Sequence, residues 1–414
     1  MLDIKLIREN PELVRKSLER RKSDYPLDKL ISIDKDWRAG LQGMEKLKAV
    51  RNKVSLEMAK KKDQSKIKEM KEINADIKSL EEKVGDLEHR ERELLLGIPN
   101  ILHDSVPEGT GEEDNAVVRS WGKIEKPAFK LKDHVDIALA LDLLDMERAA
   151  KVSGARFAYL KNDLVKLDYA LMMFALDNLM SKGYTAVEPP YLLMRKPLEG
   201  AVVLSTFGEM IYKIEGGDLN LIGTSEHAIA AMHMDEVLDS LPLKYAGISP
   251  CFRKEAGAHG KDTKGIFRGH QFNKVEQFIF CKPKDSWDYI EELIKNAEEL
   301  FKTLGLPYRI MTLCSTETGM VSAKTYDLEV WMNNQGKYRE AVSCSNCTDY
   351  QARRLNIKYN EGSKREFVHT LNSTAIATSR AMVAILENNQ QKDGSILIPE
   401  ALQDYMGKKV IKRK

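Results

Sequence analysis

The sequence predicts an α+β protein in which a long antiparallel helical hairpin precedes a domain of mixed strands and helices. Two features lead to this prediction. Apolar residues recur every three or four positions over residues 28–97, which is the period of a helix. From residue 131 onward, helical segments and segments of alternating polarity follow one another. The chain has 414 residues, which is enough for two or three domains with a large core.

Composition narrows the functional classes. The formal net charge is +2 with 31% charged residues, so the chain is not a general polycation, and any RNA binding must use local basic patches. No apolar run approaches about 18 residues, so no membrane span is expected. The N-terminal residues lack the apolar core of a signal peptide. Five scattered cysteines, an odd number, favour a reducing cytoplasmic location.

The first structural elements are expected to be helical. Residues 1–25 form a short helix in this prediction, capped around Asn10 and Pro11 and ending before Pro26. Two long helices follow, with a turn near residues 63–65. Roughly 35 residues per helix at about 1.5 Å each give a reach of about 50 Å. The apolar seam consists of Leu30, Ile33, Trp37, Leu41, Met44, Leu47 and Val54 on the first helix and Ile67, Met70, Ile77, Leu80, Val84, Leu87 and Leu94 on the second.

Such a hairpin has two interpretations. A coiled coil of this length often serves dimerisation. The first helix, however, is rich in Lys and Arg, while the second is mixed to acidic, and a basic face suits an RNA backbone better than a symmetric zipper. Lys46, Lys53 and Lys60 are therefore the candidate RNA contacts.

The chain is expected to divide into an arm over residues 1–105, with its coiled coil at about 28–97, a linker over 106–130, and a second domain over 131–414. The linker is rich in proline and turn residues. In the second domain, Leu164–Lys182 is an amphipathic helix that ends at Gly183, a C-cap, and a strand with two prolines follows it.

The most informative stretch is Cys251–Phe280, which reads as two strands joined by a polar loop over 256–266. On a strand, Arg253 and Glu255 share one face, and so do Phe272, Lys274 and Glu276. A guanidinium binds phosphates or carboxylates, a carboxylate accepts from amino groups, and an exposed ring stacks on a base. The stretch thus suggests a site for a nucleotide and an amino acid, with a solvated Arg–Glu ladder as the alternative.

Two neighbouring segments add polar groups. Thr224 and Glu226 can hold an ammonium group, although Thr-Ser-Glu before a helical run is also typical of a helix cap. Asn372 and Thr374 are two apart before a helix, on which Arg380, Ala384 and Glu387 share a face; solvated side chains are the alternative there.

A third segment suggests a metal. Glu340 and Ser343 are three apart, so a bulge or a strand end is needed before both can touch one ion, and oxygen ligands beside phosphates suit Mg²⁺. The adjacent Cys344 and Cys347 form a CxxC that by itself suggests zinc or redox chemistry. A closed zinc site lacks further ligands of the right spacing, so these cysteines are interpreted as packed.

Four stretches, in this order, resemble the seryl family of class II aminoacyl-tRNA synthetases, and the resemblance covers essentially the whole chain. They are GTSE from Gly223, the stretch CFRKEAGAHGKDTKGIFRGHQFNKVEQFIF from Cys251, EAVSCSNCTDYQARR from Glu340 and LNSTAIATSRAMVAILENNQ from Leu371. The resemblance implies an antiparallel β-sheet catalytic domain flanked by helices, and a homodimer formed through the helix that ends at Gly183 and the strand after it. It also implies that ATP and serine form seryl-adenylate with Mg²⁺, and that serine then passes to tRNA(Ser). Whether tRNA(Sec) is also charged stays open.

The resemblance also implies roles for individual residues. Arg253 bridges the serine carboxylate and the ATP α-phosphate, and Arg380 contacts the γ-phosphate. The implied serine contacts are Thr224, Ser225, Glu226, Arg253, Glu276, Asn372 and Thr374. The implied ATP contacts are Arg253, Lys254, Glu255, Gly269, Phe272, Glu340, Ala341, Val342, Ser343 and Arg380, with Glu340 and Ser343 also on Mg²⁺. Arg253, Glu255 and Arg380 are the catalytic candidates. The roles of Arg268 and of the loop over 256–267 are not assigned.

Two other functions are consistent with parts of the sequence. An RNA-binding adaptor could keep the scaffold without catalysis, but it would not need the charged residues Arg253, Glu255, Glu276, Glu340 and Arg380. A paralogue that loads an amino acid onto a carrier protein would resemble the second domain but lack the helical arm, which is present here.

Overall fold

The computed structural model describes residues 1–60, 64–125, 127–255 and 264–413. The chain forms two compact units, Met1–Pro99 and Asn100–Lys414. In the described part of the chain, no helix is long and apolar enough to span a membrane. The predicted α+β class, with a helical arm and a sheet domain, is confirmed.

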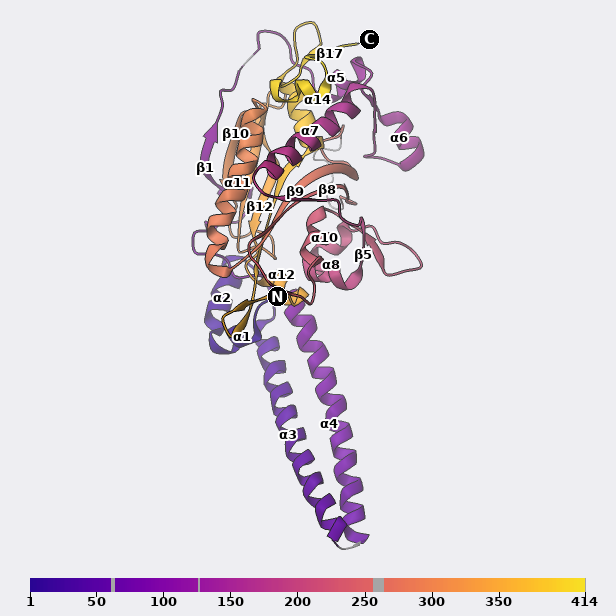
Figure 1. Cartoon of the computed structure of the whole chain (residues 1–414), viewed down its shortest axis with the longest axis vertical. Helices are drawn as coiled ribbons and strands as arrows, with labels where there is room; N and C mark the ends of the chain where they lie inside the picture. The colour runs from indigo at the N-terminus through magenta and orange to yellow at the C-terminus, as the bar shows by residue number, and fades with distance from the viewer. Residues whose placement is uncertain (61–63, 126, 256–263, 414) are drawn as a thin grey trace. The chain divides into compact units, whose positions relative to one another are not determined.

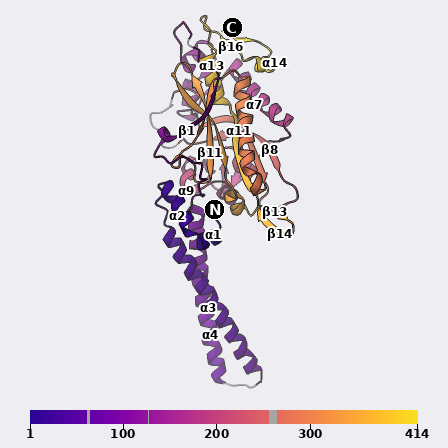
Figure 2. The same ribbon diagram turned by 90° about the vertical axis from the view of Figure 1, so that its left-hand side faces the viewer.

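The first unit is helical. Where one helix was expected, the chain forms α1 (Ile4–Glu9) and α2 (Pro11–Arg20), because the side chain of Asn10 accepts from Leu13 N at 3.2 Å and starts a new helix there. The long helices α3 (Leu27–Lys60) and α4 (Gln64–Gly97) run side by side in both ribbon views (Figures 1 and 2). The predicted hairpin is confirmed, with about 51 Å per helix; residue 63 of its expected turn lies outside the described residues.

The seam of the hairpin combines apolar and small residues. Val54, Ile73 and Ile77 are buried between the helices. At Gly40, an added Cβ would lie 2.8 Å from Val84 Cγ2, so this position needs a residue without a side chain for the helices to approach so closely. At the base of the arm, Arg8 pairs with the buried Asp34.

The second unit is built on an eight-stranded sheet. Its spatial order is β1-β10-β11-β12-β15-β9-β8-β4, antiparallel throughout except for the β4–β8 pair. The strands are β1 (Ala116–Trp121), β4 (Thr185–Val187), β8 (Leu243–Phe252), β9 (Gln271–Cys281), β10 (Tyr308–Thr312), β11 (Lys324–Met332), β12 (Lys337–Asn346) and β15 (His369–Ala377). β1 falls inside the predicted linker 106–130: its short alternating run pairs with β10 at the edge of the sheet.

Short strands form four smaller sheets. They are β2 (Leu144–Asp145) with β3 (Tyr159–Leu160), β5 (Leu192–Met194) with β6 (Leu219–Leu221), β7 (Val237–Leu238) with β13 (Lys358–Glu361) and β14 (Lys364–Phe367), and β16 (Ile396–Leu397) with β17 (Val410–Ile411). The helices of this unit are α5 (His134–Ala140), α6 (Met146–Ser153), α7 (Asp163–Ser181), α8 (Arg195–Ala201), α9 (Leu204–Phe207), α10 (Ser225–Ala231), α11 (Ser286–Thr303), α12 (Tyr350–Leu355), α13 (Thr378–Asn388) and α14 (Gln403–Met406). α7 matches the predicted helix, and Gly183 after it has φ +83°, as a C-cap requires.

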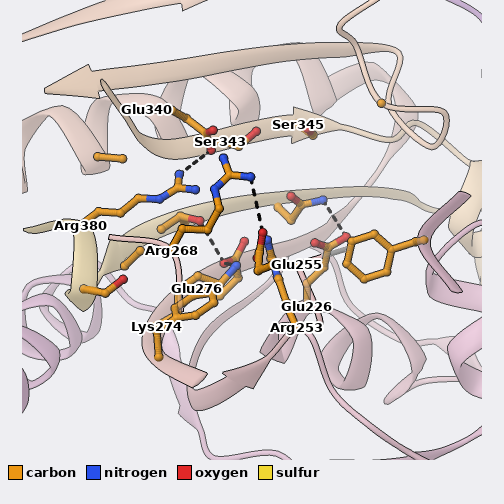
Figure 3. A pocket seen from close by; sticks show the side chains of 18 of the residues that line it. Glu226, Arg253, Glu255, Arg268, Lys274, Glu276, Glu340, Ser343, Ser345 and Arg380 are labelled. Atoms are coloured by element: carbon orange, nitrogen blue, oxygen red, sulfur yellow. Dashed lines mark hydrogen bonds and ion pairs between the residues drawn. The ribbon is translucent and has the colours of Figure 1, made fainter. Parts of the chain in front are cut away.

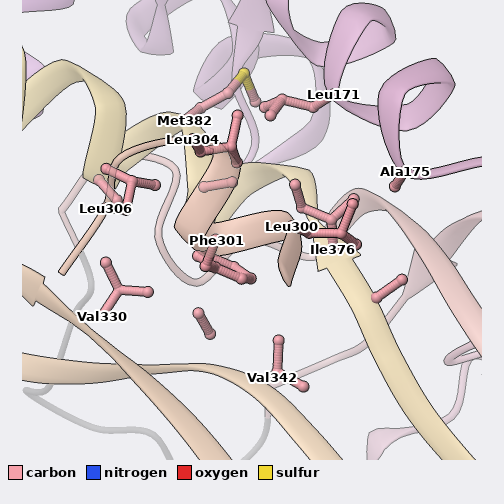
Figure 4. Packing of buried hydrophobic residues seen from close by; sticks show 14 of the residues in the cluster. Leu171, Ala175, Leu300, Phe301, Leu304, Leu306, Val330, Val342, Ile376 and Met382 are labelled. Atoms are coloured by element: carbon pink, nitrogen blue, oxygen red, sulfur yellow. The ribbon is translucent and has the colours of Figure 1, made fainter. Parts of the chain in front are cut away.

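The two faces of the sheet carry different cores. On β9, Val275 and Ile279 join a large cluster with α7, α11 and α13, part of which Figure 4 shows around Phe301. Phe278 and Phe280, on the opposite face, join a smaller cluster with α8, α10 and α12. Alternation along β9 therefore sends its remaining even-numbered side chains to the second face, where the pocket described below lies.

Candidate active site

A pocket of about 340 Å³ opens on the face of the sheet that carries Phe278. Charged and polar side chains from β9, β12, β15, α10 and α13 converge on it (Figure 3). Its lining is Phe207, Glu226, Arg253, Glu255, Phe267, Arg268, Gly269, Phe272, Lys274, Glu276, Gly319, Val321, Ser322, Glu340, Ala341, Ser343, Ser345, Cys347, Asn372, Thr374, Ala377, Ser379 and Arg380. Most of the predicted site residues are thus brought together.

Arg253 and Glu255 reach the pocket by a different route from the one predicted. β8 ends at Phe252, so the two residues do not share a strand face. Glu255 instead has a left-handed backbone with φ +48°, and Arg156 Nη1 donates to its carbonyl oxygen at 3.0 Å. Arg268 Nη1 lies 3.5 Å from Glu255 Oε2. Arg156, which is remote in sequence, therefore holds the backbone of Glu255 in place.

The guanidinium of Arg253 is held at the pocket by three neighbours. Its Nε donates to Gly223 O at 3.0 Å. The guanidinium carbon is 5.5 Å from the ring centre of Phe272 and 5.9 Å from that of Phe207. The Gly223 bond and the two rings fix its position, and within the described ranges its other nitrogens have no hydrogen-bond acceptor, so they can bind an anionic ligand.

Phe272, Lys274 and Glu276 share one face of β9, as alternation predicted. Lys274 Nζ forms an ion pair with Glu276 Oε2, and both side chains are buried. Burial raises the pKa of the Glu276 carboxyl, against the lowering effect of the Lys274 charge.

Of Thr224, Ser225 and Glu226, only Glu226 is among the described residues that line the pocket. Thr224 is the N-cap of α10 and its Oγ1 accepts from Glu226 N at 3.3 Å, so the capping alternative is what the structure contains. Ser225 is buried and donates to Gly247 O. Burial, followed by the neighbouring charge of Glu276, raises the pKa of Glu226 to about 7.

The strand β15 places Asn372 and Thr374 beside these carboxylates. Asn372 Nδ2 donates to Glu226 Oε1 at 3.1 Å, and Gln351 Nε2 donates to the same oxygen at 3.1 Å. Thr374 Oγ1 lies 3.4 Å from Glu276 Oε2. The two residues belong to a strand that continues to Ala377, and α13 begins after it.

Glu340 and Ser343 lie at the other end of the pocket. The pairing of β11 with β12 shifts at Ala341, which is a β-bulge, so both side chains line the pocket despite their three-residue spacing. Figure 3 shows them on one strand, with Arg380 pointing at Glu340. Arg380 Nη1 donates to Glu340 Oε1 at 2.7 Å, and its charge lowers the pKa of the Glu340 carboxyl.

Some predicted residues lie away from the pocket. The side chain of Lys254 lines a second cavity of about 690 Å³ and lies over the ring of Tyr212, 5.6 Å from its centre. Val342 is buried in the large core (Figure 4).

Gly269, by contrast, lines the pocket as predicted, and a Cβ there would be 3.2 Å from Arg156 O. Residues 256–263 of the predicted loop lie outside the described residues.

The two cysteines of the CxxC are buried and not joined by a disulfide. Burial raises the pKa of both thiols, which opposes their acting as thiolates. Cys347 lines the pocket, and its Sγ is 3.6 Å from Asn372 Nδ2. Across the described ranges, no cluster of three or more His, Cys, Asp or Glu side chains is arranged to hold a metal ion.

Sequence reasoning missed several lining residues. Lys274 could have been identified from the sequence, because it alternates with Phe272 and Glu276 on one strand face, but no role was assigned to it. Ser345 alternates with Ser343 in the same way. Phe207 lies in a segment without a distinguishing pattern, and Phe267 belongs to the loop over 256–267 to which no role was assigned; the tertiary structure brings both to the pocket.

Comparison with known proteins relates both units to one kind of enzyme. Residues 1–102 match the model of the seryl-tRNA synthetase N-terminal domain, and residues 212–389 match that of the tRNA synthetase class II core domain (G, H, P, S and T). A relative from Nitrosopumilus maritimus, described as a serine–tRNA ligase, is 50% identical over 416 residues that cover 98% of this chain and 99% of the relative.

Two solved structures are similar over their whole length. Seryl-tRNA synthetase from Pyrococcus horikoshii complexed with ATP aligns with a TM-score of 0.96 at 48% identity, covering 100% of both chains. Cytoplasmic serine–tRNA ligase from Naegleria fowleri in complex with AMP aligns with a TM-score of 0.90 at 42% identity, covering 100% of this chain and 99% of the other.

Proposed function

The chain belongs to the seryl-tRNA synthetases and is a serine–tRNA ligase, and we propose that it works in two steps. In the first, the serine carboxylate attacks the ATP α-phosphorus, which forms seryl-adenylate and releases pyrophosphate. In the second, a terminal ribose hydroxyl of tRNA(Ser) attacks the seryl carbonyl and releases AMP. The observation that carries this proposal is that Arg253 lines one pocket together with the carboxylates of Glu226, Glu276 and Glu340 and the guanidinium of Arg380.

Adenylation brings two anions together, so it requires positive charge and positioning more than a nucleophilic side chain. We assign Arg253 to the serine carboxylate and the α-phosphate, because its guanidinium lines the pocket and its Nε is fixed on Gly223 O. Glu226 and Glu276 are the acceptors for the amino-acid end, and Asn372 and Thr374 lie beside them. Thr224 and Ser225 act by holding Glu226, through the start of α10.

The nucleotide end has its own set of groups. Phe272 supplies a stacking surface for adenine, and Glu255 an acceptor for its amino group. Arg380 is the contact for the γ-phosphate, and Gly269, which also lines the pocket, is the residue beside which the nucleotide lies. The similar structures, one complexed with ATP and one in complex with AMP, support the proposal that this chain binds a nucleotide. Ala341 also lines this pocket. Lys254 lines the second cavity and Val342 is buried in the large core, so neither is assigned a role.

The residues at this end fit Mg²⁺. Glu340 and Ser343 present oxygen donors from one bulged strand, which is the donor type that Mg²⁺ prefers. Behind them, Asp327 is buried, and its Oδ1 has no hydrogen-bond partner in the described part of the chain. A bound Mg²⁺ would neutralise phosphate charge; Glu340 and Ser343 would hold it, and Arg380 would orient Glu340.

The remaining proposals concern partners. Lys46, Lys53 and Lys60 are exposed along α3 and supply the positive charge for a contact of the arm with tRNA. A homodimer through α7 and β4 is supported by exposed apolar side chains on α7, among them Tyr169 and Met173. Five cysteines without a disulfide suit the cytoplasm as the place of action.

The test is ATP–pyrophosphate exchange with each common amino acid, followed by charging of tRNA. Exchange that depends on serine, and charging of tRNA(Ser), are expected. Exchange with another amino acid in preference to serine would contradict the proposal, and no exchange with any would favour the RNA-binding adaptor. Charging tRNA(Sec) transcripts beside tRNA(Ser) decides whether both are substrates.

A further inference from the structure

The amino-acid end of the pocket contains two buried carboxylates in unequal surroundings. The Glu226 carboxylate is held by two neutral amides, Asn372 and Gln351, which donate to one of its oxygens. The Glu276 carboxylate has a cation in contact with it, since Lys274 Nζ pairs with its Oε2. One carboxylate is thus neutralised by the protein, and the other is left for a ligand cation.

Lys274 is confined to this partner. Its side chain is 7% exposed, and its direct neighbours across the sheet are Ser249 on β8 and Ala377 on β15, which carry no charge. Cross-strand pairing places Thr374 opposite Glu276, with its hydroxyl 3.4 Å from the same Oε2. Glu276 is therefore held from two sides, by a cation and by a hydroxyl.

A buried charge is costly unless it is paired, so the pocket favours a ligand that completes its charge balance. The protein groups at this end are the Glu226 and Glu276 carboxylates, the Lys274 ammonium and the Arg253 guanidinium. A serine zwitterion fits them: its carboxylate faces Arg253, its ammonium has one unpaired carboxylate to bind, and its side chain is neutral.

We propose that Lys274 is a positioning and specificity residue, which neutralises Glu276 so that this carboxylate receives the neutral hydroxyl of serine while Glu226 binds the ammonium. This inference rests on the proposed function, and it assigns the serine hydroxyl to Glu276 and the serine ammonium to Glu226. It implies that the pocket rejects an amino acid whose side chain carries a second ammonium. The amino acid that differs from serine by that one group is L-2,3-diaminopropionate.

The experiment compares Lys274→Gln, Lys274→Met and Lys274→Arg with the unchanged chain. The Gln variant keeps a hydrogen-bond donor for Glu276 but has no charge, and the Arg variant keeps the charge. Lys244→Met is the matched control. Lys244 lies on the adjacent strand β8, pairs with Glu292 at 2.8 Å and is not among the residues that line the pocket. Serine- and diaminopropionate-dependent pyrophosphate exchange is measured between pH 6 and 9, with thermal unfolding as the check of the fold.

We expect the ratio of kcat/KM for serine to that for diaminopropionate to fall by about tenfold or more in the Gln and Met variants. The Lys274 charge also lowers the pKa of Glu226, whose carboxylate must be ionised to bind the ammonium, so the acid limb of the serine profile should move up when that charge is removed. Lys274→Arg should retain the original ratio in large part, and Lys244→Met should retain it fully.

Folded Gln and Met variants with an unchanged ratio and an unchanged pH profile would overturn the proposal. If neither variant folds, while Lys274→Arg folds and keeps the original ratio, Lys274 has a purely structural role and the proposal fails as well. Failure of the proposed function is a separate result, because the unchanged chain would then show no exchange with serine.

Discussion

Glu340 and Ser343 line the same pocket although they are three residues apart on β12, because the pairing with β11 shifts by one residue at Ala341. In a regular strand the two side chains would lie on opposite faces. The bulge gives one carboxylate and one hydroxyl a common direction, and Arg380 fixes the carboxylate at 2.7 Å. A local irregularity in a sheet thus creates the oxygen-donor end of the site.

Arg253→Ala should abolish pyrophosphate exchange, with a loss of about 10²-fold to 10³-fold or more, because it removes the cation between two approaching anions. The fold should be retained, since Arg253 lines the pocket and, among the described residues, its side chain donates a hydrogen bond to Gly223 O alone. Arg309→Ala is the control, because Arg309 pairs with Glu329 outside the pocket. Near-normal exchange by a folded Arg253→Ala variant would refute the assignment.

Serine should be preferred over alanine by roughly 10⁴-fold or more, because a pocket built to bind a hydroxyl leaves buried polar groups unpaired when the hydroxyl is missing. The groups concerned are Glu276 and Thr374, whose side-chain oxygens lie 3.4 Å apart. Threonine should be excluded mainly by size, which is a weaker filter. The measurement is kcat/KM for exchange with each amino acid; similar values for alanine and serine would show that these groups do not bind the hydroxyl.

Serine binding should weaken below about pH 7. Burial and the Glu276 charge raise the pKa of Glu226 to about 7, so below that pH its carboxyl carries a proton and no longer attracts an ammonium. KM for serine should therefore rise as the pH falls from 8 to 6, by at most about tenfold per unit. Glu226→Gln should bind serine poorly and lose this dependence. A KM that stays constant over this range in the unchanged chain would contradict the role of Glu226.

Exchange should depend on Mg²⁺, and the purified protein should hold no stoichiometric zinc. Oxygen donors at Glu340 and Ser343 suit Mg²⁺, whereas Cys344 and Cys347 are buried thiols with raised pKa. Chelation with EDTA should stop exchange, and added Mg²⁺ should restore it. Elemental analysis that finds one zinc per chain, lost in Cys347→Ser, would overturn this prediction.

Deleting residues 30–94 and closing the gap with a short linker should spare seryl-adenylate formation and abolish efficient charging of tRNA. Activation uses groups in the second unit, while α3 carries the exposed cations. Charge reversal at Lys46, Lys53 and Lys60 should reproduce part of the loss and lower the slope of log K against log salt by roughly 0.7–0.9 per lost phosphate contact.

The arm test needs two comparisons. Exchange and charging are measured side by side at two salt concentrations, and Lys364→Glu, an exposed lysine of the second unit, serves as the control for charge reversal. If the truncated chain charged tRNA as well as the full chain, the arm would be structural or dimerising instead.

The sequence by itself determined the elements whose pattern is local. The helices α3 and α4 and the alternation of Phe272, Lys274 and Glu276 on β9 were predictable, because burial of one face requires a fixed period of apolar and polar residues along the chain. The spacing of Glu340 and Ser343 also predicted that something irregular must lie between them. These features depend on residues that are neighbours in sequence.

Only the tertiary structure decided how remote segments complete the site. The two-residue spacing of Arg253 and Glu255 indicated a strand, but Arg156, about a hundred positions away, holds the carbonyl of Glu255 in a left-handed turn. Likewise, the raised pKa of Glu226 follows from its burial and from the charge of Glu276, which the fold brings close to it. Burial and the contacts between distant strands set these properties, and no local pattern in the chain encodes them.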